Sequence, residues 1–270
     1  MKPSLPRLIH EQQSKVAVLS ARTTLKEPEK TLLPIMATAE YKIVVLNKST
    51  GSQNYLFFNQ KPEESPSVGK IYNNVWIRSP GVGTPNGRAT FDVKVANFAI
   101  CGTTPVPVDY GVVVSTSDSA AVQLKSNTQP GTVPVMEIVS DGPQYVPPYG
   151  TTDKDNSFGI QTKPFDPDRY KTVYCGYGKF NDRGEVVPVA VWRALPNETY
   201  QLTPKVTYYV GTGSYAAGTA VDITQIGALA EIDFTNALPG QVIATVTHNR
   251  DGTYSATEFS YPGNKKPRAA

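Results

Sequence analysis

Alternation of apolar and polar residues is the clearest pattern along the chain, and residues 88–98 show it best. Successive side chains of a β-strand point to opposite faces, so a period of two predicts a strand with one buried face. The apolar positions are Ala89, Phe91, Val93 and Val95, and the polar positions between them are Thr90, Asp92 and Lys94.

Further strand-like runs occur along the whole body of the chain. They are rich in Val, Thr and aromatic residues, and Gly, Pro, Asn and Asp separate them. No segment predicts a helix with comparable strength, so the pattern predicts an all-β fold, an antiparallel β-sandwich. The other predicted strands are residues 41–47, 54–59, 73–78, 110–115, 120–125, 133–139, 170–180, 186–192, 198–210, 219–224, 230–234, 242–247 and 253–259.

Local signals add detail to this prediction. The turn residues 48–51 between two apolar runs predict a hairpin of 41–47 and 54–59. Residues 110–115 are apolar on both faces and predict a central strand. Pro188 cannot donate a backbone hydrogen bond, so it predicts an edge or a bulge. Asn249 to Gly252 end in an Asp-Gly pair, which is typical of a tight hairpin turn.

Composition supports strands over helices. The chain holds 29 Val and 27 Thr but 13 Leu, and six of these Leu fall within the first 33 residues. Val and Thr suit a pleated surface, whereas Leu favours helices. We therefore expect a basic, weakly packed N-terminal arm over residues 1–38.

A Pro-rich, aperiodic stretch divides the body. Long segments without periodicity are uncommon inside a domain and are functional or linkers when they occur. We expect two packed sandwich halves; one large sandwich or barrel with a long insert is the alternative. The expected parts after the arm are a first half at 39–140, a connecting loop at 141–169, a second half at 170–261 and a disordered basic tail at 262–270.

Charge and hydropathy exclude several classes. Residues 36–260 carry 17 basic and 20 acidic residues, so the basic excess belongs to the two ends. A nucleic-acid-binding domain needs a basic face, which the body lacks, so we expect no nucleic-acid partner. No apolar run is long enough to span a membrane as a helix. The first residues do not match a signal peptide, which favours the cytoplasm.

Few residues suggest catalysis. The histidines are His10 and His248, and we expect His248 to be an exposed strand-end residue beside a turn. Cys101 and Cys175 do not match metal-ligand spacing, so two reduced, buried thiols are expected, with one disulfide bridge as the alternative. We expect no catalytic residue, metal or cofactor.

A glycine motif near the end of the chain does not change this expectation. Residues 211–216 match a dinucleotide-binding pattern, but a strand follows where that motif needs a helix. We therefore interpret them as a hairpin loop.

Aromatic and acidic residues gather in and just after the aperiodic stretch. Aromatic rings stack on the apolar faces of sugars, and short acidic side chains hold hydroxyls. The candidate ligand-binding residues are Tyr145, Tyr149, Asp153, Asp155, Asp168, Arg169 and Tyr170.

The sequence favours a soluble, non-catalytic β-sandwich that binds a glycan or small molecule through this aromatic, Asp-rich loop. Two alternatives stay open. One is a cofactor-free enzyme that acts on a small molecule in a sandwich or barrel cavity. The other is a self-associating structural protein, since many Val- and Thr-rich strands offer edges for pairing in a homo-oligomer.

Overall fold

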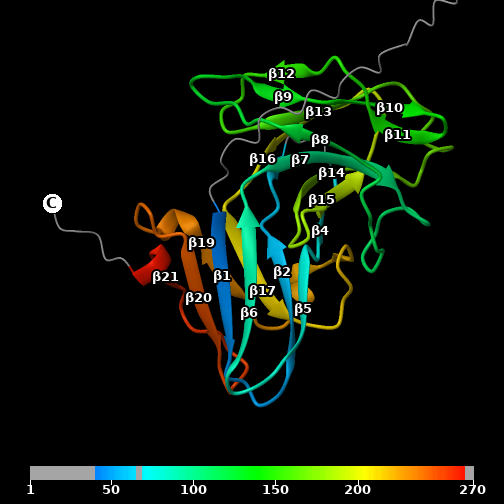
Figure 1. Cartoon of the computed structure of the whole chain (residues 1–270). Coiled ribbons are helices and arrows are strands. Elements are labelled where there is room, and N and C mark those ends of the chain that lie inside the picture. The colour runs from blue at the N-terminus through cyan, green and yellow to red at the C-terminus, as the bar shows by residue number, and fades with distance from the viewer. Residues whose placement is uncertain (1–39, 65–68, 265–270) are drawn as a thin grey trace, which may run out of the picture. The chain divides into compact units, whose positions relative to one another are not determined.

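The computed structural model describes residues 40–64 and 69–264, and these residues are nearly all β (Figure 1). The predicted all-β, sandwich-like class is confirmed. The three helices of the described part are single 3₁₀ turns. They are η1 (Ile223–Gln225), η2 (Phe234–Asn236) and η3 (Pro262–Asn264).

Two four-stranded sheets face each other as one sandwich. Figure 1 shows their strands running side by side. The first sheet, in the order β21-β20-β1-β6, contains β1 (Glu40–Asn47), β6 (Gly87–Lys94), β20 (Ile243–His248) and β21 (Glu258–Ser260). The second, in the order β19-β17-β2-β5, contains β2 (Gln53–Asn59), β5 (Ile77–Val82), β17 (Thr207–Thr212) and β19 (Ala230–Asp233).

A six-stranded and a five-stranded sheet make a second layered pair. The six-stranded sheet, β18-β4-β15-β14-β7-β8, contains β4 (Tyr72–Asn74), β7 (Asn97–Thr103), β8 (Asp118–Val122), β14 (Val173–Phe180), β15 (Val186–Arg193) and β18 (Ala220–Val221). The five-stranded sheet, β11-β10-β13-β16-β3, contains β3 (Glu63–Glu64), β10 (Val135–Val139), β11 (Gly142–Tyr145), β13 (Phe158–Thr162) and β16 (Thr199–Thr203). A two-stranded sheet joins β9 (Gly131–Val133) and β12 (Gly150–Thr152).

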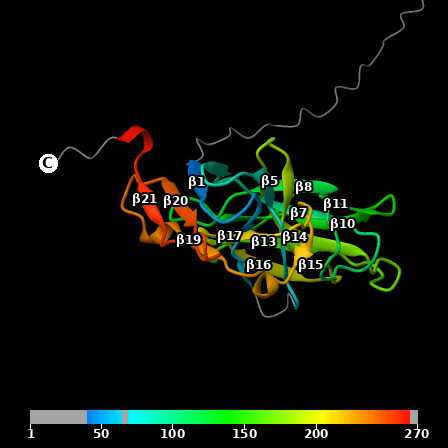
Figure 2. The same ribbon diagram turned by 90° about the horizontal axis from the view of Figure 1, so that it is seen from below.

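One apolar cluster runs through both sandwiches, which lie next to each other in Figure 2. Phe57 of β2 stacks on Phe91 of β6 with ring centroids 4.8 Å apart, and this contact crosses between the two four-stranded sheets. Across the other pair of sheets, Trp192 of β15 meets Tyr200 of β16 edge-to-face, with ring centroids 5.3 Å apart. All four side chains are fully buried.

The strand predicted at 88–98 exists, but it ends earlier than expected. β6 stops at Lys94, and β7 begins at Asn97 in another sheet. Within β6, Ala89, Phe91 and Val93 are buried, so the predicted alternation is correct. Pro188 lies opposite Gly178 where the register of β14 and β15 shifts, which confirms the predicted bulge.

The hairpin predicted from 41–47 and 54–59 is wrong. Both strands exist, but β1 pairs with β6 and β20, whereas β2 pairs with β5 and β17. The segment between them crosses from one sheet to the facing sheet. Buried Asn47 holds this crossing, because its amide donates to the C=O of Gly51 and of Val82 at 3.0 and 2.7 Å.

Two further predictions need correction. Residues 110–115 form no strand beyond one bridge from Val113 to Thr219, and Tyr110 and Val113 are exposed. The apolar run at 110–115 covers the outer face of the six-stranded sheet, where Val114 packs in a second cluster with Ile100 and Tyr174.

The segment 141–169 is not a loop, because it contains β11, β12 and β13.

Strand pairing also crosses the expected division of the chain at 141–169. β1 and β6 share a sheet with β20 and β21, and β7 lies beside β14. The sheets are therefore not built from contiguous halves of the sequence, which weighs against the expected two-half organisation. The expected N-terminal arm lies outside the described residues, as does the tail beyond Asn264, whereas residues 262–264 form η3.

We predict that Phe57→Ala lowers the free energy of unfolding by about 3–5 kcal/mol, because it leaves a cavity against Trp76, Phe91 and Tyr208. Urea unfolding of the full chain measures this. Arg88→Ala on the exposed face of β6 is the control, with an expected change within about 0.5 kcal/mol. A loss below about 1 kcal/mol for Phe57→Ala would contradict the central place of this side chain.

Candidate functional site

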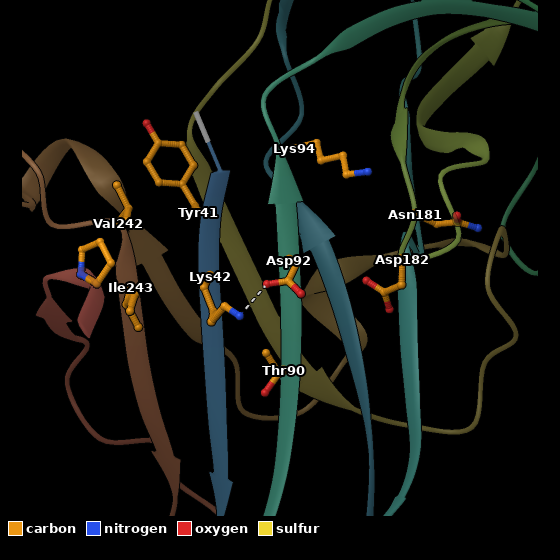
Figure 3. A pocket seen from close by; sticks show the side chains of 10 residues that line it. Tyr41, Lys42, Thr90, Asp92, Lys94, Asn181, Asp182, Val242 and Ile243 are labelled. Atoms are coloured by element: carbon orange, nitrogen blue, oxygen red, sulfur yellow. Dashed lines mark ion pairs between the residues drawn. The ribbon is translucent and has the colours of Figure 1, made fainter. Parts of the chain in front are cut away.

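A groove of about 560 Å³ lies on the outer face of the sheet that contains β1 and β6 (Figure 3). Alternation in β6 turns Thr90, Asp92 and Lys94 away from the core, so the buried face of the strand dictates the polar lining. The turn after β14 closes the groove on one side. The lining residues are Tyr41, Lys42, Thr90, Asp92, Lys94, Asn181, Asp182, Val242, Ile243 and Pro262.

One ion pair lies across the groove. Lys42 and Asp92 are direct partners in the antiparallel ladder of β1 and β6, and Lys42 Nζ lies 3.1 Å from Asp92 Oδ1. Both side chains are about half exposed, so the pair contributes little to stability. Its consequence is positional, since it holds both charged groups at the surface of the groove.

A second acid and a second base line the same groove. Asp182 and Lys94 form no ion pair within 4 Å among the described residues. Partial burial raises the pKa of the Asp182 carboxyl, and the nearby negative charge of Asp92 raises it further. Lys94 Nζ lies 5.5 Å from the centre of the Phe180 ring. The groove thus offers a carboxylate and an ammonium to which the described part of the chain supplies no counter-ion.

The neighbouring residues keep this arrangement rigid. Tyr41 stacks on Phe234 with ring centroids 4.1 Å apart, so one face of its ring is covered. Asn181 Oδ1 accepts from the backbone N–H groups of Arg183 and Glu185, both at 2.9 Å. Asn181 therefore holds the turn that carries Asp182 beside the groove.

The sequence pattern gave part of this site. It placed Thr90, Asp92 and Lys94 on one face of a strand, but a polar strand face by itself indicates only exposure to water. The missing information was that the turn at 181–184 lies beside that face. This neighbourhood depends on a tertiary contact between β14 and β6 that no local pattern encodes.

The candidate residues from the aromatic, Asp-rich segment do not gather in the groove. Tyr145 is buried, and its hydroxyl donates to the C=O of Ile100 at 2.9 Å, so its ring belongs to the core. Tyr149 is 37% exposed. Asp153 and Asp155 are exposed, and Asp155 lies 3.6 Å from Lys125 Nζ.

Three of the predicted residues, Asp168, Arg169 and Tyr170, are consecutive. Arg169 and Tyr170 form a separate surface cluster with Asp141. Asp141 Oδ1 accepts from Arg169 Nη2 at 2.9 Å and from the Tyr170 hydroxyl at 2.8 Å. Arg169 also lies over the Tyr170 ring, 5.1 Å from its centre. Asp168 is exposed, and its backbone N–H donates to Asp166 Oδ1, as in an Asx turn. A ligand-binding role for this cluster stays a prediction.

His248 is not the exposed strand-end residue that the sequence predicts. It is 5% exposed; its Nδ1 lies 3.1 Å from the Tyr55 hydroxyl, and its ring stacks on Tyr254. Burial lowers the pKa of His248. The adjacent turn does form as expected, with Asn249 N–H donating to the C=O of Thr253.

Lys179 is a buried amine that sequence reasoning missed. It is 3% exposed, and its Nζ lies 5.9 Å from the Trp76 ring centre and 5.7 Å from that of Tyr177. No ion pair of Lys179 occurs in residues 40–64 and 69–264. Burial lowers the pKa of its ammonium group to about 7.

The fold and the groove together define a β-sandwich protein with a mixed-charge surface site. The described residues hold no cluster of three or more His, Cys, Asp or Glu side chains that could bind a metal ion. Within the same residues, no helix has the length and apolar character needed to cross a membrane.

The chain belongs to the RhiA family, whose family model matches residues 38–257. That match spans every residue of the groove except Pro262. No curated protein and no solved structure matches the chain.

We predict that the free energy of unfolding rises between about pH 7 and about pH 10 through Lys179. In this window the amine stays protonated in the unfolded chain but is neutral when folded, so the unfolded state binds more protons. Burial of the charged amine therefore costs stability below about pH 7, and this cost is relieved as pH rises through the window, by about 5 kcal/mol at full size.

The measurement is urea unfolding of Lys179→Met and of the parent chain across this pH range. We expect the variant to gain most relative to the parent below about pH 7 and to lose that advantage by about pH 10. Lys171→Met at an exposed position is the control and gives a constant difference. A constant difference for Lys179→Met would contradict the prediction.

Proposed function

We propose that this protein is a non-catalytic binding protein that holds a small, hydroxyl-rich molecule such as a glycan unit in the groove of β1 and β6. The observation that carries the proposal is a carboxylate, Asp182, and an ammonium, Lys94, in one groove of about 560 Å³, neither of which has an ion-pair partner in residues 40–64 and 69–264. Ligand pockets for small molecules typically fall in the range of about 300–1,000 Å³.

The balance of charge favours a neutral ligand. Two acidic and two basic side chains line the groove, so a ligand of one sign meets repulsion as well as attraction. Hydroxyl groups avoid this conflict, because each donates to a carboxylate and accepts from an ammonium group. Val242, Ile243 and Pro262 add apolar surface for the carbon skeleton of a sugar.

A second candidate site follows from the predicted aromatic, Asp-rich segment. The shared acceptor Asp141 holds Arg169 and Tyr170 in a defined geometry on the surface. Because Tyr145 is buried and Asp155 lies beside Lys125, the surface available there is smaller than the sequence suggested. A homo-oligomer also stays a prediction, which light scattering of the full chain would check.

The test is a screen of the full chain on a glycan array, followed by calorimetric titration with the strongest ligand. We predict that Asp182→Asn and Lys94→Gln each weaken binding by more than about 1 kcal/mol, as expected for groups that anchor a ligand. The melting temperature should change little, since both side chains lack an ion pair among the described residues.

Glu231→Gln and Lys48→Gln are matched controls, because both residues are exposed and lie outside the groove. Binding that survives both groove substitutions but is lost in Arg169→Ala would transfer the function to the Asp141 cluster. If a zwitterionic amino acid binds, no glycan binds, and Asp182→Asn and Lys94→Gln weaken that binding, the groove stays the binding site but its ligand is not a sugar.

A further inference from the structure

The two cysteines of the chain occupy one position in the fold. Cys101 on β7 and Cys175 on β14 are direct partners in the antiparallel ladder, although far apart in the sequence. Each residue of β7 has a single direct partner on β14. Two cysteines placed at random would rarely meet in this way, so the coincidence calls for a chemical explanation.

The hydrogen-bond pattern shows which kind of pair this is. Ala194 N–H donates to the C=O of Val173 at 3.1 Å, so this carbonyl faces β15. Backbone groups alternate in direction along a strand, so those of Cys175, two residues on, also face β15 rather than β7. Thr104 N–H donates to the C=O of Thr172, which agrees with this phase on the β7 side.

Cys101 and Cys175 therefore form a non-hydrogen-bonded pair. In such pairs the Cα atoms lie about 4.5 Å apart and the side chains approach most closely. Disulfides join Cα atoms about 4.4–6.8 Å apart. The backbone of the folded protein thus already meets the main distance requirement for a bond between the two sulfur atoms.

Both thiols point into the main apolar cluster, and both are fully buried and unbonded in this structure. Gly176 and Gly178 fix this orientation. A Cβ at Gly178 would lie 2.6 Å from Ile100 Cγ2, so larger residues are excluded from the opposite face of β14. Burial raises the pKa of both thiols, and the proximity of Cys175 raises that of Cys101 further.

We propose that Cys101 and Cys175 are a disulfide-forming pair that is oxidised while the protein folds and is inert afterwards. The oxidant is a disulfide, such as oxidised glutathione or a thiol oxidoreductase. One cysteine thiolate attacks it, forming a mixed disulfide and releasing one thiolate. The second cysteine thiolate then attacks the mixed disulfide at the protein sulfur, and the other oxidant thiolate leaves. Two protein thiols are oxidised, and one oxidant disulfide is reduced.

The timing follows from burial. The thiolate is the reacting species, and the raised pKa of both groups keeps the folded thiols protonated. Exchange is therefore fast only before β7 and β14 close over the sulfur atoms. The same fold then exists as a dithiol or a disulfide form, and the redox conditions during folding select between them.

The experiment refolds the reduced full chain from urea with reduced dithiothreitol or with a mixture of oxidised and reduced glutathione. Thiols are then alkylated in denaturant, and peptide mass spectrometry maps any linked cysteines. We expect a Cys101–Cys175 bridge after oxidative refolding, a native circular dichroism spectrum and a higher melting temperature than the dithiol form. We expect folded dithiol protein in the same glutathione mixture to keep both thiols for at least tenfold longer.

The single variants Cys101→Ser and Cys175→Ser are the controls, and neither should gain an intramolecular bridge or a higher melting temperature. Native protein with two alkylatable thiols after oxidative refolding would overturn the proposal. So would a bridged chain that fails to regain the native spectrum, or rapid oxidation of the folded dithiol form. A bridge only between separate chains would overturn it as well.

Discussion

The structure depends on one continuous apolar core shared by two sandwiches. Phe57 lies at its centre on the side of the four-stranded sheets, in contact with Trp76, Phe91 and Tyr208. Trp76 in turn reaches the second sandwich, where its indole N–H donates to the C=O of Phe180 at 3.1 Å. Burial of large aromatic surfaces supplies most of the driving force in such a core. Because the inner faces of the strands hold the sheets together, the residues on the outer faces are free to form a surface site.

The groove results from this difference between the inner and outer faces of the strands. Phe91 and Val93 of β6 are buried in the core, and the alternating residues Thr90, Asp92 and Lys94 line the groove on the outer face. Trp76 couples the groove to the second sandwich, because the hydrogen bond to Phe180 fixes the end of β14 from which the Asn181 turn departs. Lys179 is buried at this junction and, of the described residues there, is the charged one that lies inside, so the stability of the junction depends on its protonation.

The sequence patterns predicted the positions of most strands correctly, but they did not predict which strands pair with each other. The alternation around Phe91 identified β6, and Pro188 identified the bulge, because both signals are local. The 41–47 and 54–59 hairpin failed because a turn signal does not distinguish a hairpin from a crossing between facing sheets. Lys179 lies on the same face of β14 as Cys175 and Tyr177, so the alternation along the strand predicts that it is buried. A lysine is normally expected at the surface, and for this reason its burial was not predicted. The groove could not be predicted, because it depends on the contact of β14 with β6, and no run of neighbouring residues specifies that contact.

The pairing of β1 with β20 has a consequence for synthesis of the chain. These strands are parallel neighbours, with Lys42 opposite Ile243 and Asn47 opposite His248. β6 follows β1 closely in the sequence, whereas β20 follows nearly all the other strands, so one edge of β1 has no partner until almost the whole body has been made. During that interval an apolar strand edge is open to other chains, and such edges invite misassembly. The sheet that carries the groove is therefore the last of the body to gain its full set of strand pairings, because both β20 and β21 follow the other strands in the sequence.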